Sequence, residues 1–141
     1  MFTPYLFFRG QCREAMTFYA ALFGGEVQFL RYSDMPPGEG AEDYAESEAI
    51  MHAKLVCPEG GEFSGSDYPD GMDLGAMNGV YLSRDIRGEA QAHRIFAALS
   101  EGGTVIWPWG AMFWAPGFGL CHDRFGVPWM IMALPEGGAL G

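Results

Sequence analysis

The stretch Phe18-Tyr-Ala-Ala-Leu-Phe-Gly-Gly-Glu-Val27 recurs later in the chain as Ile95-Phe-Ala-Ala-Leu-Ser-Glu-Gly-Gly-Thr-Val105. Tyr19 and Leu22 match Phe96 and Leu99 with the same offset of 77 residues. Each copy ends a helical pattern with glycines and then enters a segment with β-branched residues, as expected for a helix followed by a strand. We therefore expect two copies of one supersecondary unit in these 141 residues.

Hydrophobic periodicity predicts the order βαβββ in both halves. Helical spacing of apolar residues is found at Ala15, Phe18, Tyr19 and Leu22, and again at Ala92, Ile95, Phe96 and Leu99. The predicted strands are residues 2–8, 26–32, 49–56 and 62–66, then 77–83, 103–107, 118–123 and 127–134. Loops are predicted at the acidic residues 33–48, at the linker 67–75 and at the Trp-rich residues 108–117.

This order of elements predicts an α+β fold. One domain is expected, made of two tandem βαβββ modules at about residues 1–68 and 76–134. Each module leaves one face of its sheet without a helix, so two modules are expected to form a cupped mixed sheet. A cavity lined by both modules is a usual place for a small ligand.

The composition excludes several classes of protein and partner. With 49% hydrophobic residues, the chain has enough apolar surface for a packed core. The net charge is −10 and the 8 basic residues are scattered, so no nucleic-acid partner is expected. An anionic membrane would repel the chain, and its apolar runs are shorter than the roughly 20 residues of a membrane span.

The cysteines favour a reducing compartment. Cys12, Cys57 and Cys121 are odd in number and far apart in the sequence. Secreted disulfide frameworks have an even and denser cysteine count. We therefore expect three free thiols and a cytoplasmic protein.

The segment Pro4-Tyr-Leu-Phe-Phe-Arg-Gly-Gln-Cys-Arg-Glu-Ala-Met-Thr-Phe-Tyr19 resembles the vicinal oxygen chelate superfamily, which includes glyoxalase I, extradiol dioxygenases and bleomycin-resistance proteins. Similarity to its PhnB-like branch is carried by Phe23-Gly24-Gly25, Ser33-Asp-Met-Pro-Pro37, Ile50-Met-His-Ala53, Leu99-Ser-Glu-Gly-Gly103, Phe118-Gly and Asp123-Arg-Phe-Gly-Val-Pro-Trp129. The resemblance extends from Thr3 to about Ala133. It implies the paired βαβββ fold and leaves the activity open, because the branch is functionally vague.

The resemblance also gives four positions for a metal. Metal-using members have one ligand in the first strand and one in the last strand of each half. Here these positions fall on Pro4, on Ser64 or Gly65, on Gly79 and on Met130. A divalent metal of this kind needs imidazole or carboxylate donors. We therefore predict no metal and no other cofactor.

The predicted ligand cavity follows from strand alternation. If Pro4, Gly79 and Met130 mark the open face, alternate residues of the same strands share it. The residues predicted on this basis are Leu6, Phe8, Tyr81, Ser83, Met130 and Met132, with His52 as a polar addition and Trp114 from the aromatic loop. No catalytic residue is assigned.

Other polar and aromatic residues keep alternative interpretations. His52 lies either in the cavity or on the opposite face, and His93 is expected to face solvent. Cys121, His122 and Asp123 are adjacent in sequence, but neighbouring strand residues point to opposite faces, so a catalytic triad is not expected. The aromatic cluster is compatible with a dimer interface, a cavity rim or ordinary core, and consists of Trp107, Trp109, Phe113, Trp114 and Phe118.

Two functions remain open at this point. The first is a metal-free, homodimeric protein that binds a small organic molecule, as metal-free bleomycin-resistance proteins do. The second is an enzyme of the lyase, isomerase or dioxygenase type, either metal-independent or with a relocated metal at His52 and Glu62. Neither the ligand nor the substrate is identified by the sequence.

Overall fold

A computed structural model describes residues 1–36, 38, 47–68 and 71–136 of the chain. The chain divides into two compact units, Met1–Leu74 and Gly75–Gly141. Each unit contains one four-stranded mixed sheet and one twelve-residue α-helix, as the repeat predicts. Within the described residues, neither helix has the length and apolar character needed to cross a membrane.

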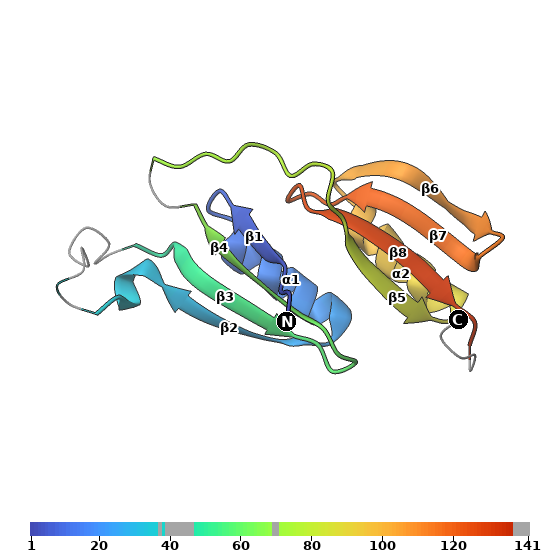
Figure 1. Ribbon diagram of the computed structural model, residues 1–141, viewed down its shortest axis with the longest axis horizontal. Coiled ribbons are helices and arrows are strands. Elements are labelled where there is room, and N and C mark those ends of the chain that lie inside the picture. Colours follow the sequence, from blue (N-terminus) through green and yellow to red (C-terminus); the bar gives the residue numbers. More distant parts are fainter. Residues whose placement is uncertain (37, 39–46, 69–70, 137–141) are drawn as a thin grey trace. The chain divides into compact units, whose positions relative to one another are not determined.

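The first unit has the order βαβββ, followed in Figure 1 from blue to green. Its elements are β1 (Tyr5–Phe8), α1 (Cys12–Phe23), β2 (Glu26–Arg31), the short 3₁₀ helix η1 (Tyr32–Asp34), β3 (Ile50–Val56) and β4 (Glu62–Asp67). The sheet order is β1-β4-β3-β2, with β1 parallel to β4 and the other pairs antiparallel. Most of the predicted acidic loop, residues 37 and 39–46, lies outside the described residues.

The second unit repeats this plan. Its elements are β5 (Leu82–Arg87), α2 (Glu89–Ser100), β6 (Thr104–Met112), β7 (Ala115–His122) and β8 (Pro128–Leu134). The sheet order β5-β8-β7-β6 again has one parallel pair, β5 with β8. The two helices start at residues 12 and 89, so the offset of 77 residues holds for their whole length.

Two predicted boundaries in the second unit are wrong. The strand expected at residues 77–83 is β5 at Leu82–Arg87, because Gly75 and Gly79 adopt positive φ in the preceding segment. Most residues of β5 are polar or charged, so the strand has no apolar run that would predict it. The Trp-rich segment at residues 108–117 is mostly strand, since β6 continues to Met112 and β7 begins at Ala115. Pro108 is tolerated because β6 is an edge strand whose pairing with β7 is irregular.

The core of each unit lies between its helix and one face of its sheet. In the first unit, the ring of Tyr19 on α1 meets Phe63 on β4, with ring centroids 5.8 Å apart. In the second, a Cβ atom on Gly119 would lie 2.6 Å from the ring of Phe96 on α2. Glycine at this position of β7 therefore lets the helix approach the bare backbone of the strand.

Asp67 joins three elements of the first unit. Its side chain is buried at the end of β4, with an exposed fraction of 3%. The Cys12 amide at the start of α1 donates to Oδ1 (2.9 Å), and the Ile50 amide at the start of β3 donates to Oδ2 (2.8 Å). The side chain of the N-cap residue Gln11 makes no capping bond, so the carboxylate of Asp67 takes that role from another strand.

We predict that Asp67→Ala lowers the free energy of unfolding by about 3 kcal/mol, because two buried amides lose their acceptor at about 1–3 kcal/mol each. Denaturant unfolding followed by circular dichroism measures the change. Asp73→Ala is the matched control, since Asp73 pairs with Arg9 in an exposed ion pair and its loss should cost less than about 1 kcal/mol. Equal effects of the two substitutions would contradict the role given to Asp67.

The three cysteines are free thiols, as predicted, and all three are buried. Burial, and secondly the carboxylate of Asp67, raise the pKa of Cys12 from 9.0 to about 12. Burial also raises the pKa of Cys121. Both thiols are therefore protonated at neutral pH and are poor nucleophiles.

Cys12 makes the stability depend on pH in the alkaline range. Between about pH 9 and 12 the unfolded chain loses the thiol proton while the folded chain keeps it. The free energy of unfolding should therefore fall by up to about 1.4 kcal/mol per pH unit from this group alone. Denaturant unfolding across this range should give a shallower fall for Cys12→Ala than for the wild type. Parallel pH dependences for the two proteins would refute the raised pKa.

Candidate functional site

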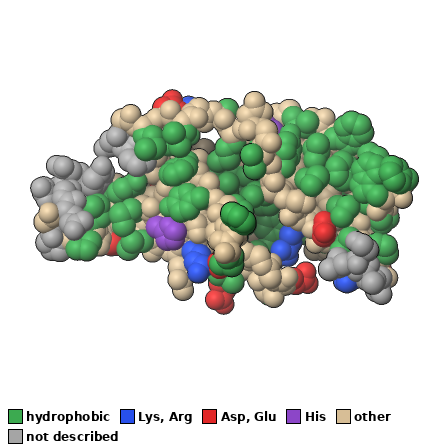
Figure 2. Space-filling model, viewed as in Figure 1, with side chains coloured by type: hydrophobic (Ala, Val, Ile, Leu, Met, Phe, Trp, Pro, Cys, Tyr) green, Lys and Arg blue, Asp and Glu red, His purple; other side chains and the backbone are tan. Residues whose placement is uncertain are grey.

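Each sheet has one face that its helix does not cover. Within each unit the helix lies against one face of its own sheet (Figure 1), and the other face of that sheet is left without a helix. Hydrophobic side chains gather over the strands of the second unit in the same view (Figure 2). Strand register shows which predicted site residues lie on these faces.

Leu6 and Phe8 lie on the other face, contrary to the prediction. Leu6 pairs with Gly65 and Phe8 with Asp67, on the side of the sheet where Phe63 meets the helix. Both side chains are buried in the core. Alternation itself holds, but Pro4 precedes β1 and is the wrong starting point for counting. The residues of β1 on the open face are Tyr5 and Phe7.

The open face of the second unit carries a group of four half-buried apolar side chains, which we call the apolar platform. Its members are Phe118 and Leu120 on β7 and Met130 and Met132 on β8. Phe118 pairs with Met132 and Leu120 with Met130, so the four form two adjacent rows. The predicted residues Met130 and Met132 are thus brought together here.

Trp114 continues the apolar platform toward the turn between β6 and β7. Its ring meets that of Phe118 edge to face, with centroids 5.6 Å apart, and Phe113 stacks in the same way on Trp114 at 4.7 Å. Phe113 is 98% exposed. The rings of Phe118, Trp114 and Phe113 therefore form a continuous aromatic surface from the open face to the exposed turn.

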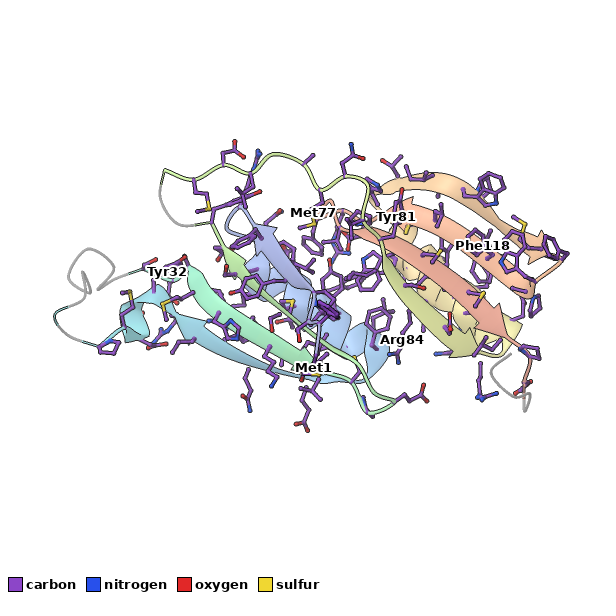
Figure 3. All side chains as sticks on the ribbon, in the orientation of Figure 1. Met1, Tyr32, Met77, Tyr81, Arg84 and Phe118 are labelled. Carbon is purple, nitrogen blue, oxygen red and sulfur yellow. The ribbon has the colours of Figure 1, made fainter. Side chains whose placement is uncertain are left out.

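Polar groups border the apolar platform on two sides. Ser83 and Asp85 on β5 are exposed and pair with Met130 and Met132 of the platform. At the end of the platform, the Tyr81 hydroxyl and His122 Nε2 lie 3.4 Å apart. Figure 3 shows Tyr81 beside the start of β5 and Phe118 on β7. The predicted residues Tyr81 and Ser83 thus belong to the same surface as Met130.

The open face of the first unit is polar by comparison. Ser64 and Ser66 are buried there, and His52 and Lys54 of β3 are exposed. The Tyr5 hydroxyl lies 3.1 Å from His52 Nδ1, so His52 faces the open side and not the helix. Lys54 pairs with Glu62 at 3.5 Å. The open face of the first unit therefore carries hydrogen-bonding groups beside the apolar side chains of Phe7 and Leu30.

The sequence Cys121-His122-Asp123 forms no triad. Cys121 is buried beside Trp129 on the helix side, whereas His122 points to Tyr81 on the open face. Asp123 accepts hydrogen bonds from the Phe125 and Val127 amides and from Trp129 Nε1, and so closes the turn before β8.

The aromatic cluster divides between two sides of the second unit. Trp109 lies against Phe96 of α2, stacks on His93 with ring centroids 5.4 Å apart, and donates to Glu89. It therefore covers the edge of the helix. His93 is exposed, as predicted. Trp107 and Phe113 present large exposed apolar surfaces, and Trp114 lies against Phe118 of the platform.

The residues predicted at the four metal positions carry no imidazole or carboxylate, and two of them, Pro4 and Gly79, precede the strands in which the ligands are expected. Gly79 precedes β5 and is not part of a strand, while Met130 is a platform residue and Ser64 is a buried hydroxyl. None of these supplies an imidazole or carboxylate donor. Among the residues that the structure describes, no three His, Cys, Asp or Glu side chains gather in an arrangement suited to a metal.

Comparison with known proteins identifies the family. The model of the family described as 3-demethylubiquinone-9 3-methyltransferase matches residues 1–132. Protein YjdN of Escherichia coli is 33% identical, with 95% of each chain covered. The crystal structure of PA1353 from Pseudomonas aeruginosa is 36% identical with a TM-score of 0.84, covering 96% of this chain and 98% of that one. The PhnB protein from Bacillus cereus is 26% identical with a TM-score of 0.78, covering 94% and 98%.

The chain belongs to this family, in which the Bacillus cereus protein is called PhnB. The resemblance stated from the sequence is therefore confirmed, and so is the α+β fold of two βαβββ modules. The description of the family names a methyltransferase, but it assigns no reaction to this chain.

Several residues of the open faces were not predicted as site residues. Phe118 was assigned only to the aromatic cluster, and Leu120 and His122 received no site role. Alternation counted from Met130 through its antiparallel partner Leu120 would have found them, because His122 and Phe118 flank Leu120 at intervals of two. That pairing was not visible before the register of β7 and β8 was known.

Proposed function

We propose that this PhnB-like protein is a cytoplasmic, homodimeric protein that binds a small organic molecule on its open sheet faces without a metal. The observation that supports binding is the apolar platform of Phe118, Leu120, Met130 and Met132. These side chains are half-buried on a sheet face that no helix of their unit covers. Contiguous exposed apolar surface of this kind marks ligand-binding or interaction sites.

The platform suits ligands that are planar or flexible. Methionine side chains adapt their shape and make favourable contacts between sulfur and aromatic rings. Phe118 and Trp114 add aromatic surface that offers stacking or edge-to-face contact. Binding would then depend mainly on contact area, with one or two hydrogen bonds from the polar border to fix orientation.

An enzyme is the second candidate, and the Tyr5–His52 pair favours it. A histidine and a tyrosine in hydrogen-bond contact on an open face are able to act as general base and acid. The pair would serve a metal-independent lyase or isomerase. A relocated metal at His52 and Glu62 is the other form of this proposal.

The proposed dimer is supported by the charge-free hairpin of β6 and β7. Residues 104–122 contain no Asp, Glu, Lys or Arg, in a chain of net charge −10. Large apolar side chains are exposed along it, namely Val105, Ile106, Trp107, Phe113 and Trp114. Two copies of this acidic chain repel each other least at such a surface, and interface cores are rich in aromatic residues and poor in charged ones.

We predict that planar apolar compounds raise the melting temperature of the protein and that Met130→Glu abolishes the shift, because the new carboxylate would be desolvated under the ligand. A thermal-shift screen of aromatic, quinone-like and cationic compounds measures this. Met72→Glu is the matched control, since Met72 is exposed and belongs to no strand or helix.

Equal shifts of the melting temperature in both variants would show that the ligand does not bind at the platform. The metal content of the same preparation tests the form of the enzyme that has a relocated metal. Elemental analysis of protein purified without chelator should give well below one equivalent of transition metal. One full equivalent that is lost in His52→Ala would favour the enzyme with a relocated site.

For the dimer, we predict that sedimentation velocity at micromolar concentration gives twice the mass of the chain. Phe113→Asp should shift the protein to monomer, because it places a charge in the aromatic surface. Val80→Asp changes a similarly exposed apolar residue outside the hairpin and should leave the dimer intact. A monomeric wild type, or a dimer unaffected by Phe113→Asp, would disprove the proposed interface.

A further inference from the structure

The contact between Tyr81 and His122 is long for a hydrogen bond. The hydroxyl oxygen and Nε2 are 3.4 Å apart, whereas strong hydrogen bonds of this type lie near 2.8–3.0 Å. Both side chains are half-buried, and the strand partners of His122 are Pro128, which has no side-chain donor or acceptor, and Thr104 on the edge strand β6. A weak bond of this kind between partly desolvated groups is easily exchanged for bonds to a ligand.

This pair lies at one end of the apolar platform. Along β7, Leu120 is two residues from His122 on the same face, which corresponds to about 7 Å. Phe118 follows after a further step of the same length. A polar pair thus adjoins an apolar surface long enough for a planar molecule of two fused rings.

We propose, on the basis of the function proposed above, that the ligand is a planar aromatic compound with a neutral hydroxyl group, and that this hydroxyl binds Tyr81 and His122 while the ring lies on the platform. A hydroxyl both donates and accepts, so it matches the tyrosine hydroxyl and either neutral tautomer of the imidazole.

Charged head groups fit the pair less well. A carboxylate only accepts, so it pairs with the imidazole only when Nε2 carries the hydrogen, and the net charge of −10 disfavours it. An ammonium group only donates, so it can bond to the tyrosine oxygen and to an unprotonated Nε2 but accepts a hydrogen from neither. The ring of the ligand, in turn, suits the methionine and phenylalanine side chains.

The experiment compares 2-naphthol with 2-methoxynaphthalene, which has the same rings and no hydroxyl hydrogen. Titration calorimetry of the full chain should give roughly 3- to 10-fold tighter binding of 2-naphthol, the ratio expected for one net hydrogen bond. In His122→Phe the two ligands should bind equally. Tyr81→Phe should reduce the ratio, and His93→Phe, on the exposed side of α2, should leave it unchanged.

The outcomes separate this inference from the proposed function. If both ligands bind the wild type equally, or the preference for 2-naphthol survives in His122→Phe, the hydroxyl assignment is overturned while platform binding stands. Binding of 2-naphthoate as tight as that of 2-naphthol overturns it as well. If neither naphthalene binds, both proposals are contradicted, namely ligand binding at the platform and hydroxyl recognition by Tyr81 and His122. His122→Asn and circular dichroism spectra establish whether a loss of preference occurs in a folded protein.

Discussion

The first unit depends on the carboxylate of Asp67. A parallel pair such as β1 and β4 is formed only when the intervening helix and two strands return the chain to the first strand, and Asp67 lies where that return ends. Its two oxygens accept from the first residue of α1 and the first residue of β3, and its backbone carbonyl accepts from the Tyr32 hydroxyl. One buried side chain thus fixes the helix against one face of the sheet. The opposite face is left open as a direct consequence.

The second unit reaches the same arrangement by a different route. It closes the β7–β8 turn with Asp123, and it brings α2 onto the bare backbone of Gly119. The helix packs closely against only one face of each sheet. The side chains on the open face therefore need not fit against a helix, and they differ between the two units. Tyr5, His52 and Lys54 give the first unit a polar face, while Phe118, Met130 and Met132 give the second an apolar one. A shared fold therefore carries two different surfaces, and only the surfaces bear on function.

Much of the fold was predictable because its signals are local. The helical spacing around Tyr19 and Phe96, with glycines after each helix, located both helices correctly. The errors arose where the decisive information is non-local. The strand β5 is polar and is stabilised by its pairing with β8, and β6 tolerates Pro108 because it is an edge strand with irregular pairing. The face of Leu6 and Phe8 depends on their register with Gly65 and Asp67, which no local pattern reveals.

The lack of metal donors and the apolar character of the open face of the second unit both favour a ligand that is bound without a metal. Where metal-using relatives need donors, this chain has Met130 and the hydroxyl of Ser64, neither of which supplies the anionic or imidazole coordination that a divalent metal requires. The thioether at position 130 instead extends an apolar surface, and the imidazole of His122 lies 3.4 Å from the Tyr81 hydroxyl at the border of that surface. This arrangement of side chains is suited to bind a ligand through apolar contact with the platform and one polar contact at the end of the platform.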